Sequence, residues 1–120
     1  MMDKNFQAFD LRCKFGNKYF PSPVFTASGC AGSGKELAQF FDLQELGAVV
    51  TKSIALKPRS GRATPRMAET PSGMLNSIGL QGPGIDQFLE VDVPWLMSQG
   101  VRTIVSVSYT HLTLPTIYSV

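Results

Sequence analysis

The chain has 120 residues, of which 43% are hydrophobic and 17% are charged, and its formal net charge at pH 7 is +2. This balance is typical of one globular domain or a piece of one and excludes a disordered chain, and the charge excess alone is too small to indicate nucleic acid or a membrane surface as a partner. No segment reaches the roughly 18 apolar residues that span a bilayer, and the two cysteines form no CxxC pair, so we expect a cytoplasmic protein with reduced thiols.

A β-hairpin is the first predicted element. The segment LRCKFGNKYFPSPV (11–24) alternates polar and apolar residues on both sides of Gly16-Asn17, and these two residues tolerate the positive φ of a tight turn. Two prolines then prevent the second strand from continuing in a central ladder. The segment VFTAS (24–28) predicts a new, buried strand that runs into a glycine-rich loop, SGCAGSG.

A β-α-β unit is predicted next, over residues 24–53. Ser33 and Glu36 have the spacing of a capping box, and Gly47 is placed to end a helix. Apolar residues recur near helical spacing between them, at Leu37, Phe40, Phe41 and Leu46. The continuous β-branched run of AVVTKS (48–53) predicts a parallel strand covered on both faces.

The second half of the chain begins with a long connection. Residues 57–84 are rich in Pro, Gly, Ser and Arg and show no sustained period, and loops of that length are usually functional or disordered. Ile85, Phe88 and Leu89 start a second predicted helix, which Pro94 breaks or restarts. RTIVSV (102–107) predicts a third strand of the parallel type.

Two folds accommodate this order of elements: a doubly wound sheet and the opening of a (β/α)8 barrel. In both, ligand groups lie at the carboxyl ends of the strands and in the loops that follow them. The first loop lacks the GxGxxG pattern, which counts modestly against a dinucleotide-binding sheet. In either fold, Ser28, Lys52 and Ser53 point at one rim.

Lys52 and Asn76 are the polar residues whose positions are hardest to explain by folding alone. A lysine at the end of a buried strand either extends to solvent or meets an anion, and a fixed cation there suits a carboxylate, a phosphate or a ring that gains electrons. Asn76 lies within an apolar run of a loop, where its amide binds either a ligand with alternating donors and acceptors or the loop itself. Both alternatives stay open at this point.

A cluster of basic residues and the second cysteine complete the candidates. The segment LKPRSGRATPR contains Lys57, Arg59, Arg62 and Arg66. It could bind phosphates, but a solvated loop is the stronger expectation because no aromatic residues are interleaved with the cations. Cys30 has no activating base beside it in the sequence, and we expect it to be a small buried residue.

Three long segments together resemble the amino-terminal part of one enzyme family. They are TASGCAGSGKE (26–36), LGAVVTKSIALKPRSGRATPRMAETPSGMLNSIGLQGPG (46–84) and VPWL (93–96). They resemble class 1 dihydroorotate dehydrogenases, and the similarity is closest to the catalytic subunit of the NAD-dependent class 1B. It extends from about Leu11 to about Ser106. The resemblance implies an FMN-dependent (β/α)8 barrel that oxidises dihydroorotate to orotate in the de novo biosynthesis of UMP, a pyrimidine nucleotide.

The resemblance also implies roles for individual residues. The residues that would contact FMN are Ser28, Lys52, Ser53 and Ser106. The residues that would bind the substrate are Lys52, Asn76, Ser77, Ile78, Gly79 and Leu80. Two positions depart from the pattern of the family: Gly82 stands where asparagine is usual, and Ser106 stands where class 1B usually has an asparagine and class 1A has serine.

Other parts of the implied machinery lie elsewhere. The catalytic base of class 1 enzymes is a cysteine on a later loop, so neither Cys13 nor Cys30 is assigned to it, and we expect no catalytic base and no metal site in this chain. Class 1B enzymes work with a separate electron-transfer subunit that carries FAD and a 2Fe-2S cluster and passes electrons to NAD. A homo-oligomeric parent enzyme is expected, with no nucleic acid or membrane as a partner.

The last residues do not follow the family. The stretch VSYTHLTLPT resembles the in-frame translation of a sequencing-library adapter. We therefore expect residues 1–106 to be the first part of a single barrel domain, truncated after its third strand, and residues 107–120 to be a non-native tail. On this interpretation the chain alone is inactive and His111, the only histidine, has no catalytic role.

Two alternative functions remain from the sequence. One is another FMN-dependent barrel that acts on pyrimidines, and the missing catalytic loop would distinguish it. The other is a non-enzymatic anion-binding module that uses the loop from Lys57 to Arg66. Salt-dependent binding to nucleic acid, without a response to FMN or orotate, would favour that module.

Overall fold

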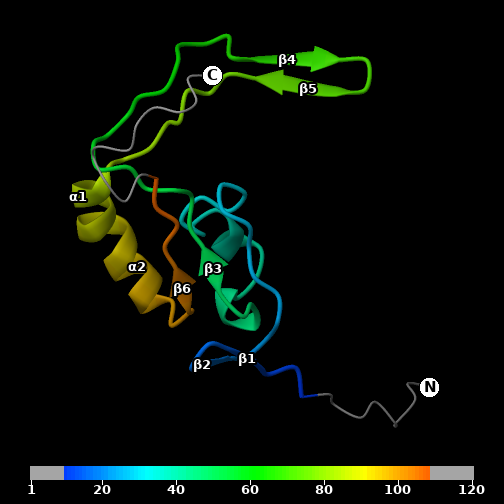
Figure 1. Cartoon of the computed structure of the whole chain (residues 1–120), viewed down its shortest axis with the longest axis vertical. Coiled ribbons are helices and arrows are strands. Elements are labelled where there is room, and N and C mark those ends of the chain that lie inside the picture. Colours follow the sequence, from blue (N-terminus) through cyan, green and yellow to red (C-terminus); the bar gives the residue numbers. More distant parts are fainter. Residues whose placement is uncertain (1–9, 109–120) are drawn as a thin grey trace.

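The computed structural model describes residues 10–108, and parallel chain segments form its centre (Figure 1). Strand β3 (Val49–Val50) pairs in parallel with β6 (Thr103–Ile104), so that Val49 lies opposite Thr103. On the other side of β3, Phe25 forms a single parallel bridge with Ala48. The parallel strands predicted at 48–53 and 102–107 are therefore confirmed.

The predicted amino-terminal hairpin is also confirmed. Strand β1 (Cys13–Phe15) pairs antiparallel with β2 (Lys18–Phe20), and the turn uses Gly16 with a φ of 60°. The buried ring of Phe20 lies 4.9 Å from the ring of Phe25, measured between centroids. The hairpin is thereby attached to the first parallel segment.

The strand predicted at 24–28 is only partly formed. Its parallel alignment is present, because the Thr26 N–H donates to the Ala48 carbonyl at 3.2 Å. The expectation of a buried strand is wrong, since Val24 is 59% exposed and Ser28 is exposed too. Within residues 10–108 no further strand pairs with its outer edge, which leaves these side chains at the surface.

The helix predicted between Ser33 and Gly47 is wrong. In its place are two short 3-10 turns, η1 (Leu37–Gln39) and η2 (Leu43–Glu45). Asp42 separates them because its backbone is extended, with a ψ of 119°, and its carboxylate accepts the N–H of Gln44, which caps a new turn. The capping box does not form either, since η1 has no side-chain cap.

Gly47 has a different role from the predicted helix cap. Its N–H donates to the Val24 carbonyl at 2.8 Å. A Cβ at this position would collide with the Ser22 carbonyl oxygen and the Phe25 ring. Glycine is therefore required because two backbone segments approach each other closely here.

A second hairpin lies inside the long connection, where no strand was predicted. Strand β4 (Met67–Thr70) pairs antiparallel with β5 (Gly73–Asn76), and all eight residues are exposed. In Figure 1 this hairpin extends away from the parallel strands. The sequence signal was the turn Thr70-Pro71-Ser72-Gly73, with proline at the second and glycine at the fourth position.

The helix predicted from Ile85 is confirmed, and its last α-helical segment restarts at Pro94, one of the two outcomes that the sequence predicted. Helix α1 (Ile85–Gln87) continues through a π-helical turn, η3 (Phe88–Asp92), into α2 (Val93–Ser98). Pro94 lies in the first turn of α2. The wider π turn provides room for a proline ring, which would otherwise clash with a carbonyl of the preceding turn. None of the described helices combines the length and the apolar character that crossing a membrane requires.

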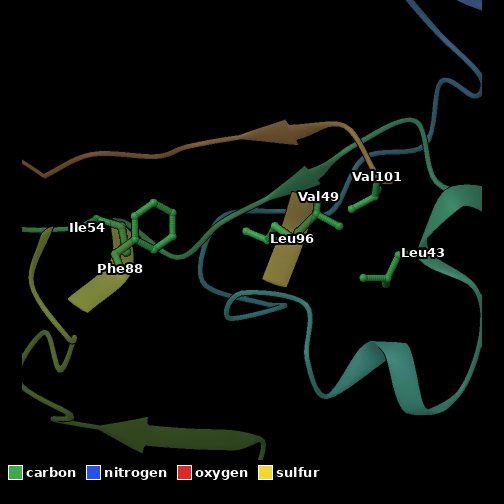
Figure 2. Packing of buried hydrophobic residues seen from close by; sticks show 6 residues of the cluster. All are labelled: Leu43, Val49, Ile54, Phe88, Leu96 and Val101. Atoms are coloured by element: carbon green, nitrogen blue, oxygen red, sulfur yellow. The ribbon is translucent and has the colours of Figure 1, made fainter. Parts of the chain in front are cut away.

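The helix packs against β3 and encloses the core. The buried apolar cluster consists of Leu43, Val49, Ile54, Phe88, Leu96 and Val101 (Figure 2). An ion pair lies beside it: the Lys35 ammonium is 2.6 Å from the carboxylate of the buried Asp92 and 5.8 Å from the centre of the Trp95 ring. This pair connects the end of the glycine-rich loop to the helix.

The described residues are a mixed α/β structure with parallel strands, as the sequence predicted. Their strands do not close into a barrel. The expected tail at 107–120 falls almost entirely outside the described residues, as does His111. Within the described range, Val107 still forms a parallel bridge with Ile54.

Phe88 tests the importance of the core. Its side chain is 1% exposed, and we expect Phe88→Ala to lower the free energy of unfolding by about 3–5 kcal/mol in urea titrations, because it leaves a cavity. Phe40→Ala is the matched control: Phe40 is 82% exposed, so the change should stay within about 0.5 kcal/mol. Equal losses in both variants would contradict the packing.

The ion pair between Asp10 and Arg12 can be tested by its dependence on pH. The Arg12 side chain donates to its carboxylate at 2.8 Å and, together with the Arg12 N–H, lowers the pKa of Asp10 from 3.8 to about 2. The lowered pKa means that the pair contributes to stability above about pH 3.8 and loses this contribution as the pH falls towards 2. In Arg12→Ala, an NMR titration should show a higher Asp10 pKa that stays below 3.8, because the backbone N–H remains. An unchanged midpoint would be the opposite result.

Candidate functional site

Three serine hydroxyls meet where the parallel segments end. The Ser53 Oγ, just after β3, lies 2.7 Å from the Ser106 Oγ, just after β6. It also lies 3.3 Å from the Ser28 Oγ, at the end of the first segment. The carboxyl ends of parallel strands share one edge of a sheet, which is where both candidate folds place their ligands. The structure thus brings together three of the residues predicted to contact a cofactor.

Lys52 lies beside these serines and is half-buried. Its backbone N–H donates to the Gly32 carbonyl at 2.9 Å, so the glycine-rich loop holds this part of the chain. A shallow hollow next to the serines is lined by Lys52, Ser53, Ala55, Lys57, Arg59, Leu80, Gln81, Gly82 and Ser108. This lining includes three cations and no acidic side chain, an arrangement that favours anions and polar rings.

The segment Asn76 to Leu80 is divided between two places. Leu80 lines the hollow of Lys52, whereas Asn76 and Ser77 line a second hollow at the base of the hairpin, with Arg66 and Met67 among its other residues. Asn76 is exposed at the end of β5. The structure therefore unites Lys52 with Leu80 but not with Asn76.

Leu80 has an unusual backbone. Its φ is 54°, the one positive value of a non-glycine residue among residues 10–108, and Gly79 before it has a φ of 85°. The Ile78 carbonyl just upstream accepts the Arg62 N–H at 2.9 Å. A non-glycine residue in this region of backbone space persists only where its surroundings hold it, and such residues gather at ligand sites.

The basic cluster is divided in the same way. Lys57 and Arg59 line the hollow of Lys52. Arg66 donates to the Arg62 carbonyl at 3.2 Å, and Arg62 donates to the Ser77 hydroxyl at 3.3 Å. Two of the four cations thus hold the loop together, and the other two remain available to a ligand.

The cysteines differ from each other in exposure. Cys30 is exposed, so the expectation that it is buried is wrong. It lies in a tight turn of the glycine-rich loop, where its N–H donates to the Ala27 carbonyl at 3.1 Å, and such turns lie at the surface. Cys13 is half-buried and donates to the Ser22 carbonyl at 3.5 Å. In the part of the chain that the structure describes, no three acidic, His or Cys side chains are grouped to hold a metal ion.

Comparison with known proteins gives consistent matches. The model of the family described as "Dihydroorotate dehydrogenase" matches residues 10–113. Over 87 residues, the chain is 52% identical to the "Dihydroorotate dehydrogenase B (NAD(+)), catalytic subunit" of Geobacillus sp. (strain WCH70), covering 72% of this chain and 28% of that protein.

Other relatives carry the same name. The protein from Alkaliphilus metalliredigens (strain QYMF) is 51% identical over 72% of this chain and 29% of its own length. The one from Thermoanaerobacter sp. (strain X514) is 43% identical over 82% of this chain and 33% of its own length. The chain thus spans about a third or less of the length of these relatives.

Ser53 tests the hydroxyl contacts. Ser53→Ala removes the group shared by Ser28 and Ser106, and we expect a loss of roughly 1 kcal/mol in the free energy of unfolding, measured in urea. Ser60→Ala is the control, because the Ser60 hydroxyl is exposed and makes only a 3.4 Å contact with its neighbour's carbonyl. No difference between the two variants would contradict the contacts.

Proposed function

Since this chain belongs to the dihydroorotate dehydrogenase family, we propose that it is the amino-terminal part of an FMN-dependent (β/α)8 enzyme that oxidises dihydroorotate to orotate. On this proposal residues up to 106 are the first part of one barrel domain, and the residues from 107 onward are foreign to it. The observation that carries the proposal is the meeting of Ser28, Ser53 and Ser106 beside Lys52 at one end of the parallel strands.

The residues at this rim fit a flavin mononucleotide. Hydroxyls can donate or accept, which suits the alternating polar atoms of the isoalloxazine ring. The hollow beside the serines also has three cations and no acid, which suits a ring that gains electrons. Bound there, FMN would supply the acceptor for a hydride from the substrate.

Lys52 has two functions on this proposal. Its ammonium places a fixed positive charge where a ring gains electrons, and it also reaches an anionic substrate. The bond from its N–H to the Gly32 carbonyl keeps its backbone in place. Ser28, Ser53 and Ser106 orient the cofactor through their hydroxyls.

The substrate site is proposed to include Lys52 and the segment Asn76, Ser77, Ile78, Gly79 and Leu80. An amide such as that of Asn76 matches the donors and acceptors of a pyrimidine ring. The left-handed backbone of Leu80 supports the proposal, because it places an apolar side chain in the hollow of Lys52. Dihydroorotate and orotate carry a carboxylate, which suits the cations of that hollow.

The final electron acceptor and the partner are proposed from the relatives. Their name contains "NAD(+)" and "catalytic subunit". We propose NAD as the final acceptor and a separate electron-transfer subunit, which would carry FAD and a 2Fe-2S cluster. The catalytic base would be a cysteine on a later loop of the barrel, beyond residue 106. The parent enzyme would be a homo-oligomer.

A chimeric enzyme tests the proposed function. Residues 10–106 would replace the matching segment of the catalytic subunit from Geobacillus sp. (strain WCH70). We expect this chimera to purify with FMN and to lose its flavin absorbance when dihydroorotate is added without oxygen. A folded chimera without FMN, or with FMN that dihydroorotate does not reduce, would overturn the proposal.

Lys52 is the residue to change in that chimera. Lys52→Met should slow flavin reduction by dihydroorotate by roughly 100-fold or more, because a preorganised charge at the reacting ring is lost. Lys18→Met, at an exposed position of strand β2 in the amino-terminal hairpin, is the control and should reduce at the unchanged rate. Stopped-flow absorbance measures both, and equal rates would exclude the role of Lys52.

A further inference from the structure

The pairing between β3 and β6 is displaced by one residue just before the serines. Val50 lies opposite Ile104, and further along Ile54 lies opposite Val107. On the β3 side, Ile54 comes four residues after Val50. On the β6 side, their partners Ile104 and Val107 are only three residues apart. One extra residue is therefore inserted between Val50 and Ile54, which is a β-bulge.

The core shows the same displacement independently. Val49 and Ile54 are both buried in the apolar cluster (Figure 2). Residues an odd number of positions apart point to opposite faces of a regular strand, so these two could not share one core without an insertion. Thr51 is buried as well, at 1% exposure, whereas Lys52 and Ser53 are both half-buried and line the same hollow.

A side-chain hydroxyl replaces the missing backbone contact at the bulge. The Thr51 N–H still donates to the Ile104 carbonyl at 3.0 Å, as in a regular ladder. The next N–H, that of Ser106, donates to the Thr51 Oγ1 at 3.2 Å. The Ser106 carbonyl then accepts the Ile54 N–H at 2.9 Å, beyond the extra residue.

We propose that Thr51 is a positioning residue whose hydroxyl holds this bulge, so that the consecutive residues Lys52 and Ser53 face one rim. A regular strand would send one of the two to the opposite face. The bulge also sets the Ser106 backbone, and with it the 2.7 Å contact between the hydroxyls of Ser106 and Ser53. For flavin binding, the inference rests on the function proposed above.

Two variants of Thr51 and one control variant distinguish the effect of the Thr51 hydroxyl from the effect of its packing. Thr51→Val keeps the shape and removes the acceptor of the Ser106 N–H. Thr51→Ser keeps the acceptor and removes a buried methyl group, so it costs stability through packing. Thr103→Val is the matched control on β6, because the Thr103 hydroxyl contacts only the Val101 carbonyl of its own segment, at 3.5 Å.

The first measurement needs no cofactor. Hydrogen exchange of the Ser106 amide, followed in the full 120-residue chain, should be at least roughly tenfold faster in Thr51→Val than in Thr51→Ser or Thr103→Val. Equal exchange in all variants would overturn the inference, whatever the protein binds.

The second measurement is the affinity of the chimera for FMN, determined by fluorescence titration. We expect Thr51→Val to bind FMN at least roughly tenfold more weakly, and Thr51→Ser to bind like the parent despite its lower melting temperature. An equal loss in Thr51→Ser would assign the effect to packing and overturn the role of the hydroxyl. If the parent chimera binds no FMN while the exchange result holds, the proposed function fails and the bulge stands.

Discussion

Strand β3 is aligned in parallel with a neighbour on each side, and this alignment brings the ends of the three segments together. Val49 and Ala48 are fully buried, and their backbone groups pair with the segment at Phe25 and with β6. Three segments that run in one direction end at one edge. Residues that are distant in the sequence, such as Ser28 and Ser106, therefore lie close together there. The strand pairing places them, and their own contacts do not determine the fold.

The end of β3 departs from regular pairing on both sides. Opposite the contact between Thr51 and Ser106, the Thr26 hydroxyl accepts the Val50 N–H at 2.7 Å and donates to the Val50 carbonyl at 3.1 Å. Side chains thus take over hydrogen bonds that backbone groups make in a continuing ladder. This keeps the polar groups of a buried strand satisfied at the level where the strand stops being regular.

The sequence predicted those elements whose signals are local. Gly16-Asn17 indicated the first hairpin, and the run of AVV indicated a strand buried on both faces. The helix prediction was wrong because Asp42 ends the first turn and acts as the N-cap of a second one. The spacing of apolar residues alone does not show such an interruption. The hairpin from Met67 to Asn76 was missed because all of its residues are exposed and show no alternation.

For the candidate site, Ser28, Lys52 and Ser53 followed from the rule that ligands gather at strand ends, whereas Ser106 followed only from the resemblance to the family. The role of Thr51 did not follow, because its hydroxyl bonds to a residue 55 positions away. In the sequence a β-branched threonine after two valines indicates nothing but a strand. Such long-range substitutions of a side chain for the backbone become visible only in three dimensions.

The hollow of Lys52 and the hollow of Asn76 are held in place by different contacts. The hollow of Lys52 is anchored to the core through Ile54 and through the loop that Lys35 and Asp92 hold to the helix. The hollow of Asn76 belongs to an exposed hairpin. Two connections join them: Arg59 and Gly82 pair in both directions, at 2.9 and 3.0 Å, and the Arg62 N–H donates to the Ile78 carbonyl. The placement of Asn76 relative to Lys52 therefore depends on this narrow backbone ladder rather than on packing.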